Sequence, residues 1–247
     1  MVHQHGQFKL TYLYMPQLAS CSNTSLCKLL SSLDKPPKVL VSASATGYYG
    51  DTGDDVLTEE SPSPSSSSSC SLPSHRIDFL SDVCKNWEEA TQIAKQSGIR
   101  VVNMRIGMVL SSSGGILSKF LPIFKLGLGG RIGNGNQYMS WIALDDLVGL
   151  VMYIIADESI AGPVNAVSPN PITNADFTAT LGKVLSRPTM FSIPEFIIKS
   201  ALGEELANAA ILSSSRVIPK HLIKIGYKFR FPYLKSILLH TLGKSIS

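Results

Sequence analysis

The feature that most constrains the fold is one apolar run, Lys38-Val-Leu-Val-Ser-Ala-Ser, which comes directly after two prolines. The run shows no alternation of polar and apolar residues, a pattern typical of a parallel strand that is covered on both faces. A short amphipathic helix is predicted before it, from Thr24 to Leu33, and Pro36 and Pro37 end that helix. A helix followed by a buried parallel strand indicates an α/β sheet.

The same alternation of helix and strand continues along the chain. The periodicity predicts further helices over 79–98 and 117–126, one that begins with Asp145 as its N-cap, and one over 174–185, and further strands over 100–110, 138–144 and 163–167. Between residues 61 and 74, nine of fourteen residues are serine and three are proline, so we expect a disordered insertion there. We therefore divide the chain into an unassigned segment 1–23, an α/β domain 24–187 and a mostly helical C-terminal region 188–247.

Composition and charge exclude several classes of protein. Charged residues make up only 16% of the 247 residues, which leaves enough apolar material for a sizeable core. The longest apolar run, Leu147 to Ala156, has ten residues, whereas a membrane span needs about 20. The net charge of +4 comes from the C-terminal part, where Lys220, Lys224 and Lys228 recur at helical spacing without any nucleic-acid motif. We expect a solvated helix face there, and neither a membrane nor a nucleic acid as partner.

The four cysteines form no CxxC pair and have no histidine at ligand spacing, so the sequence indicates neither a zinc site nor a disulfide framework. A reducing compartment, the cytoplasm, is the default expectation. Import into an organelle is the alternative, because residues 1–33 are rich in serine and contain no acidic residue, as in transit peptides.

Common catalytic motifs are missing from the sequence. There is no G-x-S-x-G elbow and no HExxH pair. Two segments, Gly47 to Gly53 and Gly127 to Gly133, have the spacing G-x-x-G-x-x-G, but neither is followed by a helical pattern that could hold a pyrophosphate. Asp145 and Asp146 are better explained as helix-start residues than as metal ligands, so no metal is expected.

The most informative segment is Val41-Ser-Ala-Ser-Ala-Thr-Gly-Tyr-Tyr-Gly-Asp. It places three hydroxyl side chains and two phenols just past the carboxyl end of the apolar strand, where α/β sheets bind ligands. In the competing interpretation, the hydroxyls satisfy a turn and the tyrosines pack on neighbours. Composition alone leaves both interpretations open.

The segment is one of six motifs that occur in the order of a known family: Val-Ser-Ala-Ser-Ala-Thr-Gly-Tyr-Tyr-Gly-Asp, Thr58-Glu-Glu-Ser-Pro, Phe79-Leu-Ser-Asp-Val-Cys-Lys-Asn-Trp-Glu, Lys125-Leu-Gly-Leu-Gly-Gly, Ser140-Trp-Ile-Ala-Leu-Asp-Asp-Leu-Val-Gly and Gly162-Pro-Val-Asn-Ala. From about Thr24 to His240 the chain resembles the epimerase-family proteins of the short-chain dehydrogenase/reductase superfamily, in the atypical branch called family 39U member 1 in animals. The resemblance implies that residues 24–187 are a partial NAD(P)-binding domain that binds NADP(H), and that 188–247 is a family-specific region. The predicted fold class is thus an incomplete Rossmann-like parallel sheet with flanking helices, because the family's first strand, its glycine-rich turn and further βα units have no match.

The resemblance also implies candidate site residues. Ser44 matches the serine that hydrogen-bonds the reacting oxygen, and Ser42, Ala43, Arg105, Gly107 and Val109 match positions beside the cofactor. None of the eight tyrosines has a lysine four residues later. On the helix after Phe79, the superfamily's Tyr-x-x-x-Lys pair falls at Leu80 and Cys84 or at Ser81 and Lys85. A phenol without that lysine is a poor base, but Tyr48 or Tyr49 can still donate a proton in a reduction.

The sequence therefore predicts an NADP(H)-dependent oxidoreductase or epimerase-like protein that acts on a small molecule of unknown identity. The alternative is a non-catalytic truncated form that serves as an interaction module. Without the leading strands, one side of the central sheet is expected to be an open edge through which the protein self-associates.

Overall fold

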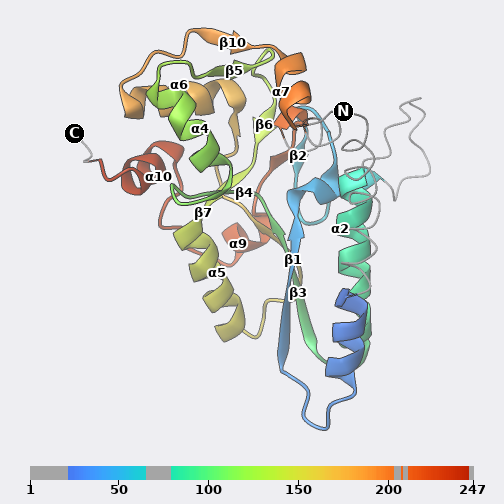
Figure 1. Ribbon diagram of the computed structural model, residues 1–247. Coiled ribbons are helices and arrows are strands. Elements are labelled where there is room, and N and C mark those ends of the chain that lie inside the picture. The colour runs from blue at the N-terminus through green and yellow to red at the C-terminus, as the bar shows by residue number, and fades with distance from the viewer. Residues whose placement is uncertain (1–21, 65–78, 203–206, 208–210, 245–247) are drawn as a thin grey trace.

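A computed structural model describes residues 22–64, 79–202, 207 and 211–244 of the chain. The predicted serine-rich insertion lies outside the described residues from position 65 onward. A helix over 22–31 opens the described part. The labelled elements that follow are β1 Val39–Ala45, η1 Thr46–Tyr49, β2 Val56–Leu57, α2 Phe79–Ala90, α3 Gln92–Gln96, β3 Arg100–Ile106, β4 Met108–Leu110, α4 Gly115–Lys125, β5 Gly130–Ile132, β6 Tyr138–Met139, β7 Trp141–Ala143, α5 Leu144–Ala156, β8 Gly162–Ala166, β9 Ile172–Thr173, α6 Asn174–Leu185, β10 Phe191–Ile193, α7 Glu195–Leu202, β11 Arg216–Val217, α9 Lys220–Lys224 and α10 Leu234–Thr241 (Figure 1).

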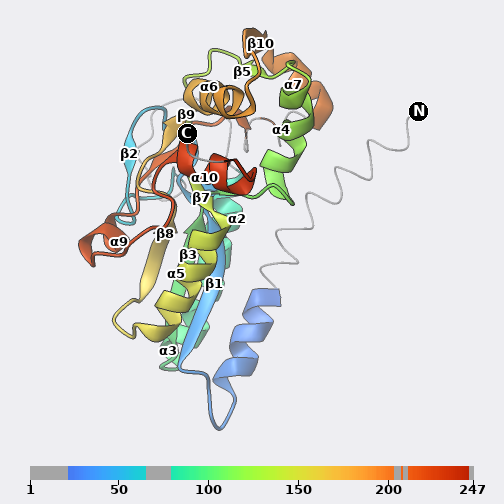
Figure 2. The same cartoon turned by 90° about the vertical axis from the view of Figure 1, so that its left-hand side faces the viewer.

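The central sheet is parallel, as predicted, with strand order β1, β3, β8. β1 and β3 run in register from Val39 opposite Arg100 to Ala45 opposite Ile106. Helices cover both faces, with α5 on one side and α2, α3 and the helix 22–31 on the other (Figures 1 and 2). This is a Rossmann-like arrangement, and it confirms the predicted α/β fold class.

Side chains that alternate along β3 build a separate core on each face of the sheet. Val102 and Met104 pack with Leu150 and Ile154 of α5. Val101 packs on the opposite face with the helix 22–31 and α3. A third and larger core surrounds the fully buried Trp141 and joins α4, α6 and α10. The C-terminal region is tied to the rest by strand pairs, because β10 pairs with β5 and β11 pairs with β2.

Three predicted elements are each interrupted once. The strand expected over 138–144 is divided at Ser140 into β6 and β7. The helix expected over 79–98 breaks at Thr91, whose hydroxyl donates to the carbonyl oxygen of Glu88 at 2.6 Å. The strand expected over 100–110 breaks at Gly107, where the amide of Met108 donates to the carbonyl of Ser140 and the chain changes partners from β8 to β7. A Cβ at Gly107 would lie 2.6 Å from that carbonyl oxygen, so glycine is required there by close approach of the two backbones.

The prediction that Asp145 is an N-cap is wrong. α5 begins at Leu144 and its N-cap is Ala143, which places Asp145 in the first turn. Asp146 is buried, and its carboxylate accepts hydrogen bonds from the backbone amides of Arg230 at 2.6 Å and Phe231 at 2.9 Å. The acidic pair therefore holds the C-terminal region against α5. Each oxygen of the Asp146 carboxylate accepts one backbone N–H from that region.

Candidate functional site

The site lies where β1 ends and turns sharply into η1. Ser44 is the penultimate residue of β1, and Gly50, with a φ of 68°, ends the turn that follows. Ser44 is buried, and its Oγ donates a hydrogen bond of 2.8 Å to Oε1 of Glu88 on α2. The hydroxyl that the resemblance assigns to the reacting oxygen is therefore already a donor to a carboxylate of this chain.

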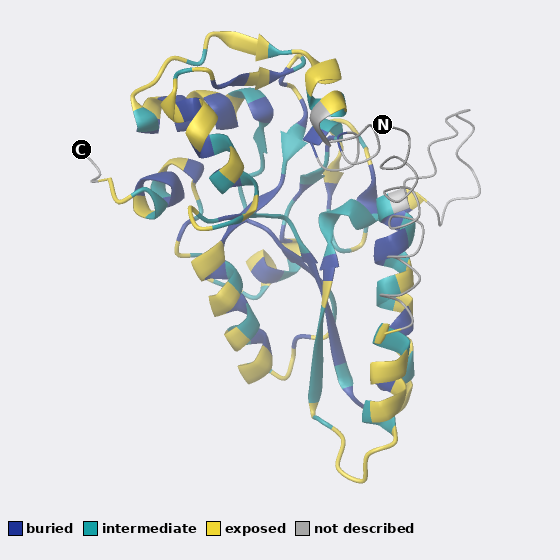
Figure 3. Cartoon of the chain, viewed as in Figure 1, coloured by how far each residue is buried: buried dark blue, intermediate teal, exposed yellow. Residues whose placement is uncertain are grey.

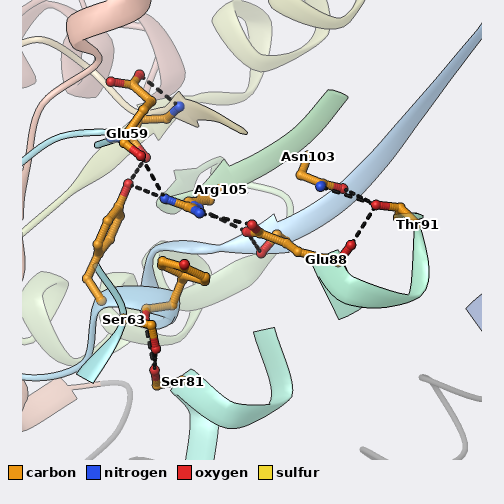
Figure 4. Close-up of polar contacts among 11 residues, drawn as sticks. Glu59, Ser63, Ser81, Glu88, Thr91, Asn103 and Arg105 are labelled. Atoms are coloured by element: carbon orange, nitrogen blue, oxygen red, sulfur yellow. Dashed lines mark hydrogen bonds and ion pairs between the residues drawn. The ribbon is translucent and has the colours of Figure 1, made fainter. Parts of the chain in front are cut away.

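Behind Ser44, Glu88 forms a buried ion pair with Arg105 of β3 (Figure 4). The pair is bidentate, because Nε of Arg105 lies 2.9 Å from Oε1 of Glu88 and Nη2 lies 2.9 Å from Oε2. Burial by itself lowers the pKa of Arg105, but the hydrogen bonds and charge of Glu88 raise it above its ordinary value. Arg105 thus stays charged in the core beneath the turn, and Glu88 holds its guanidinium plane in one orientation.

The phenol of Tyr49 belongs to the same buried network. Tyr49 is 0% exposed. Its hydroxyl donates to Oδ1 of Asn165 at 2.7 Å and accepts from Nη1 of Arg105 at 2.9 Å. Burial raises the pKa of Tyr49 to about 12, although the charge of Arg105 acts in the opposite direction. Both hydrogen-bonding functions of this hydroxyl are used inside the protein.

Tyr48 lies differently. Its ring is half-buried, and the guanidinium carbon of Arg105 sits 3.5 Å from the ring centroid. Its backbone carbonyl accepts a hydrogen bond of 2.8 Å from Oγ of Ser81 on α2. Among the contacts that the structure gives for the described residues, no hydrogen bond involves the Tyr48 hydroxyl. Tyr48 therefore combines a fixed ring with a hydroxyl that the network does not consume.

The predicted cofactor residues are placed at different points. Ser42 and Ala43 lie together on β1, where they line a cavity of about 170 Å³ beside the helix 22–31. Arg105 lies in the buried network described above. Gly107 and Val109 lie beyond the end of β3, and Val109 packs against the core on the α5 side. The sheet thus brings Ser42, Ser44 and Arg105 to neighbouring strands, with Gly107 and Val109 past the strand end.

The helix α2 supplies neither a tyrosine nor a lysine next to Ser44. Leu80 packs so closely on Gly47 that a Cβ there would lie 2.5 Å from Leu80 Cδ2. Ser81 and Cys84 are both fully buried, and Ser81 is 2.7 Å from the hydroxyl of Ser63 (Figure 4). The α2 residue that reaches Ser44 is Glu88, one turn beyond Cys84.

Neither glycine-spaced segment forms a phosphate cradle in the described residues. Gly53 has a φ of 62° and lies in a turn that no helix follows. Gly133, with a φ of 61°, lies in a turn after β5. A pyrophosphate site of the dinucleotide type needs backbone amides at a helix N-terminus, so we assign no such site to either segment.

A second hollow of about 250 Å³ opens between the loop after η1 and the C-terminal region. Its lining is mostly polar: Gly53, Asp54, Asn134, Asn136, Gln137, Glu195, Leu212 and Ser214. Two carboxylates and three amides offer hydrogen-bond acceptors and donors for hydroxyl groups, and the carboxylates disfavour anions. This hollow begins only four residues after Tyr49, at Gly53.

Three residues of the network were not predicted as site residues, namely Glu88, Glu59 and Asn165. Glu59 joins Asn165 to the C-terminal region, because its Oε1 accepts from the amide of Asn165 at 3.1 Å and its Oε2 accepts from the amide of His221 at 3.3 Å. Glu88 could have been found, since it lies on the same face of an amphipathic helix as Ser81 and Cys84. A charged residue on a buried helix face requires an opposite charge nearby, and Arg105 lies in an apolar strand.

Comparison with known proteins gives the family. The model of a domain of unknown function, DUF1731, matches residues 193–241. An epimerase family protein of Staphylococcus aureus strain MW2 is 35% identical over 217 residues, which cover 88% of this chain and 68% of that protein. The chain belongs to this epimerase family. An epimerase family protein of Mycobacterium leprae is 39% identical over 210 residues, 85% of this chain and 62% of that protein.

Among solved structures, the human epimerase family protein SDR39U1 (isoform 2) with NADPH is similar to 95% of this epimerase family chain and is covered over 75% of its own length, with a TM-score of 0.85 and 29% identity. A nucleoside-diphosphate sugar epimerase of Corynebacterium glutamicum matches 90% of the chain with a TM-score of 0.70 and 36% identity, over 41% of that protein. The chain spans about three fifths of the length of the first curated relatives that it matches, 62% and 59%. No helix in the described part of the chain is long and apolar enough to cross a lipid bilayer.

Proposed function

We propose that this chain acts in the NADP(H)-dependent oxidation–reduction or epimerisation of a small molecule, and that the corner at the end of β1 faces the nicotinamide. The observation that carries the proposal is the likeness of the chain, over 95% of its length, to the human relative solved with NADPH. The carboxyl ends of parallel strands are where α/β sheets bind their ligands, and Ser44, Thr46 and Tyr48 lie at that end of β1.

Among the described residues, those at the end of β1 fit the nicotinamide end of NADP(H) and not the rest of the dinucleotide. Ala43 is exposed and Ser42 half-buried on the strand that leads to the corner, so small side chains leave room for a flat ring. The described residues contain no glycine-rich strand–helix turn beside β1, and a cavity of about 170 Å³ is smaller than a pocket for a drug-sized ligand, which is roughly 300 Å³ or more. The grip on the rest of the dinucleotide is therefore not assigned to any residue described here.

NADPH, when bound, supplies a hydride. In our proposal the protein supplies the proton, and Tyr48 is better placed than Tyr49 to donate it. The Tyr49 hydroxyl is enclosed by Asn165 and Arg105. The Tyr48 ring lies against Arg105 and its backbone carbonyl accepts from Ser81, while its hydroxyl stays outside the network. Ser44 has a different role, because a hydroxyl that donates to Glu88 presents its lone pairs to a second donor and can accept a hydrogen bond from a substrate alcohol.

The polar hollow lined by Asp54, Asn136 and Glu195 is the proposed place for the rest of the substrate. Its donors and acceptors suit a neutral molecule with several hydroxyl groups. The relative from Corynebacterium glutamicum is a nucleoside-diphosphate sugar epimerase, and a sugar carries several hydroxyl groups.

The test is a titration of the purified chain with NADPH, followed by nicotinamide fluorescence. We expect a Kd below about 100 μM. Absence of binding at millimolar NADPH would support the alternative, a non-catalytic interaction module. With a reducible substrate in hand, Tyr48→Phe should abolish turnover and leave NADPH binding unchanged. Tyr233→Phe, at an exposed tyrosine, is the matched control.

The compartment is also a proposal. We expect the cytoplasm because the sequence indicates no disulfide framework. An organelle is the alternative. It is supported by a 36% identical relative from Arabidopsis thaliana, a chloroplastic SDR39U1 homologue that matches 84% of this chain and is covered over 56% of its own length. Fractionation of cells that express the full chain with a C-terminal tag distinguishes the two.

A further inference from the structure

The polar hollow of about 250 Å³ carries negative charge without a positive counterpart. Asp54 and Glu195 each bring a carboxylate to it, and no lysine, arginine or histidine is among its described lining residues. In the sequence, residues 203–210, which lie between α7 and Leu212 of the lining, carry no basic side chain either. The charge of the hollow therefore selects against anions.

Gln137 adds an acceptor from the buried end of the hollow. Its side chain is 9% exposed, and its Nε2 lies 3.3 Å from the carbonyl oxygen of Ile132 and 3.5 Å from that of Ile211. These two carbonyl oxygens fix the orientation of the amide, because only its NH₂ group can donate to them. Among the contacts given for the described residues, no hydrogen bond involves Oε1 of Gln137. A buried acceptor that lacks a partner indicates a ligand that donates.

The one hydroxyl that lines the hollow is already used by the protein. Oγ of Ser214 donates to the carbonyl of Gly53 at 2.6 Å and accepts from the amide of Tyr138 at 3.0 Å. The backbone of Ser214 is also bound, because its amide donates to Oδ1 of Asp51 and its carbonyl accepts from the amide of Thr52. These bonds tie the loop after η1 to the C-terminal region, so the protein itself holds the walls of the hollow together.

Both carboxylates keep an oxygen for a ligand. Glu195 lies on the exposed first turn of α7 (Figure 3). A Cβ at Gly133 would lie 3.0 Å from its Oε1, so this oxygen lies over the turn after β5. Its Oε2 lies 3.7 Å from Nζ of Lys199, in an exposed pair of the kind that contributes little. Asp54 has no hydrogen bond or ion pair among the contacts given for the described residues.

An ammonium group matches this set of acceptors. It presents three N–H donors and a positive charge, and it has no acceptor of its own. Hydroxyl groups alone would serve the side-chain amides of Asn134 and Asn136 but would leave the carboxylates without a counter-charge. A phosphate group has the opposite character, because it brings negative charge and acceptor oxygens.

We propose that the hollow holds the ammonium group of a hydroxylated amine, a free amino sugar in its chemical class. As the place of a substrate, this rests on the proposed function and narrows its small molecule to one with a positive charge. The volume of about 250 Å³ is below the roughly 300 Å³ of a drug-sized ligand, which favours a single sugar ring over a nucleotide-linked sugar. No described lining residue belongs to β1 or to the helix 22–31, so the site is separate from Ser42 and Ala43.

A divalent metal ion is the other cation that carboxylates attract. Such ions take six or more oxygen ligands, usually with several carboxylates among them. The described residues contain no group of three or more His, Cys, Asp or Glu that could hold a metal. The NH₂ groups of Asn134 and Asn136 suit hydroxyl oxygens and cannot bind a metal ion. The ammonium group is therefore the occupant that the lining favours.

Calorimetric titration of the full chain, without NADPH, compares three probes at about pH 6, where an amine is protonated. The probes are glucosamine, glucose as its neutral analogue, and a phosphorylated glucosamine as the analogue with added negative charge. We expect glucosamine to bind about tenfold more tightly than glucose, because hydrogen bonds between charged groups are stronger than neutral ones. The phosphorylated probe should bind more weakly than glucosamine.

Variants show whether the preference arises in the hollow. Asp54→Asn/Glu195→Gln keeps the shape of both side chains and removes their charges, so it should reduce the preference for glucosamine to less than about twofold. Asp55→Asn is the matched control, at an exposed carboxylate that does not line the hollow, and should keep the wild-type preference. Melting curves check that all variants fold.

The proposal is overturned if glucosamine does not bind at about 10 mM, if glucose binds equally well, or if the double variant keeps the wild-type preference. It is also overturned if Ca²⁺ displaces glucosamine at a lower concentration, which would make the hollow a metal site. NADPH binding is measured separately. A chain that binds NADPH without any preference for the amine contradicts only the amine site, and one that prefers glucosamine but does not bind NADPH contradicts only the proposed function.

Discussion

The hydroxyl of Ser44, at the end of β1, donates a hydrogen bond of 2.8 Å to the carboxylate of Glu88 on the helix α2. In this chain an α2 carboxylate therefore accepts a hydrogen bond from the hydroxyl that the sequence predicts to contact the reacting oxygen. Glu88 is itself held by two nitrogens of Arg105, Nε and Nη2. The corner is rigid because serine, glutamate and arginine share one buried network, and each depends on the others for a partner.

Removal of Arg105 tests how much this network contributes to stability. Arg105→Met leaves the Glu88 carboxylate, 12% exposed, without its counter-charge. We expect the free energy of unfolding to fall by about 3–5 kcal/mol in urea titrations, the usual cost of breaking a buried pair. Lys220→Met breaks the pair of Lys220 with Glu60, whose side chains are 51% and 76% exposed, and should lower the free energy of unfolding far less than Arg105→Met does. Equal losses in the two variants would contradict the account.

The buried phenol of Tyr49 predicts a loss of stability in alkali. Burial raises its pKa from 10.0 to about 12. Between these values the unfolded chain has released the proton and the folded chain still holds it, so stability that is fully present below pH 10 is lost as the pH rises towards 12. The loss is roughly 2–3 kcal/mol for a shift of this size.

The measurement is the free energy of unfolding below pH 10 and near pH 12 in the wild type and in Tyr49→Phe. The wild type should lose more stability than the variant, because the variant has no phenol to titrate. Tyr233→Phe, at an exposed tyrosine, should show the full wild-type loss. If Tyr49→Phe follows the wild-type curve, Tyr49 is not the group responsible.

Gly107 is predicted to tolerate no side chain. Alanine there places a Cβ 2.6 Å from the carbonyl oxygen of Ser140 and 2.8 Å from Val167. We expect Gly107→Ala to lower the free energy of unfolding by about 1–3 kcal/mol, as overpacking does. At Gly114 a Cβ meets no heavy atom within 4 Å, so Gly114→Ala should change stability by less than about 0.5 kcal/mol. A neutral Gly107→Ala would mean that β3 and β7 are not held as described.

Asp146 is predicted to hold the C-terminal region. Asp146→Asn keeps the shape of the side chain but replaces one acceptor of the Arg230 and Phe231 amides with a donor. A hydrogen bond to a charged group contributes about 1.5–3 kcal/mol, and we expect a loss of that size with faster amide exchange at Arg230 and Phe231. Asp145→Asn, at the partly exposed neighbour, is the control and should leave exchange at both amides unchanged.

The sequence predicted the parts of the fold that depend on local pattern. The strand from Val39 and the helix Asn174–Leu185 follow from apolar spacing and turn residues. The breaks at Thr91 and Gly107 were not predictable, because each depends on a partner distant in sequence, Asn103 for the first and Ser140 for the second. Asp145 was misplaced because the tertiary contacts of Asp146 with residues 230 and 231 leave no trace in local sequence.

The sequence predicted where along the chain the candidate site lies, but not which side chains contact one another there. The run from Ser42 to Tyr49 lies at the carboxyl end of a parallel strand, as predicted, but that strand is mostly half-buried and not covered on both faces. The different environments of Tyr48 and Tyr49 could not be read from two adjacent identical residues, since they depend on Asn165, 116 residues away from Tyr49. The roles of these residues towards a cofactor stay predictions.

Hydrogen–deuterium exchange of the full chain with and without millimolar NADPH tests the central claim most directly, because it reports both whether the cofactor binds and where. The account predicts slower exchange of the amides from Ser42 to Tyr48 and of Gly107, with no change at Arg230 and Phe231. Unchanged exchange throughout residues 42–48 at millimolar NADPH, or protection confined to another part of the chain, would contradict it.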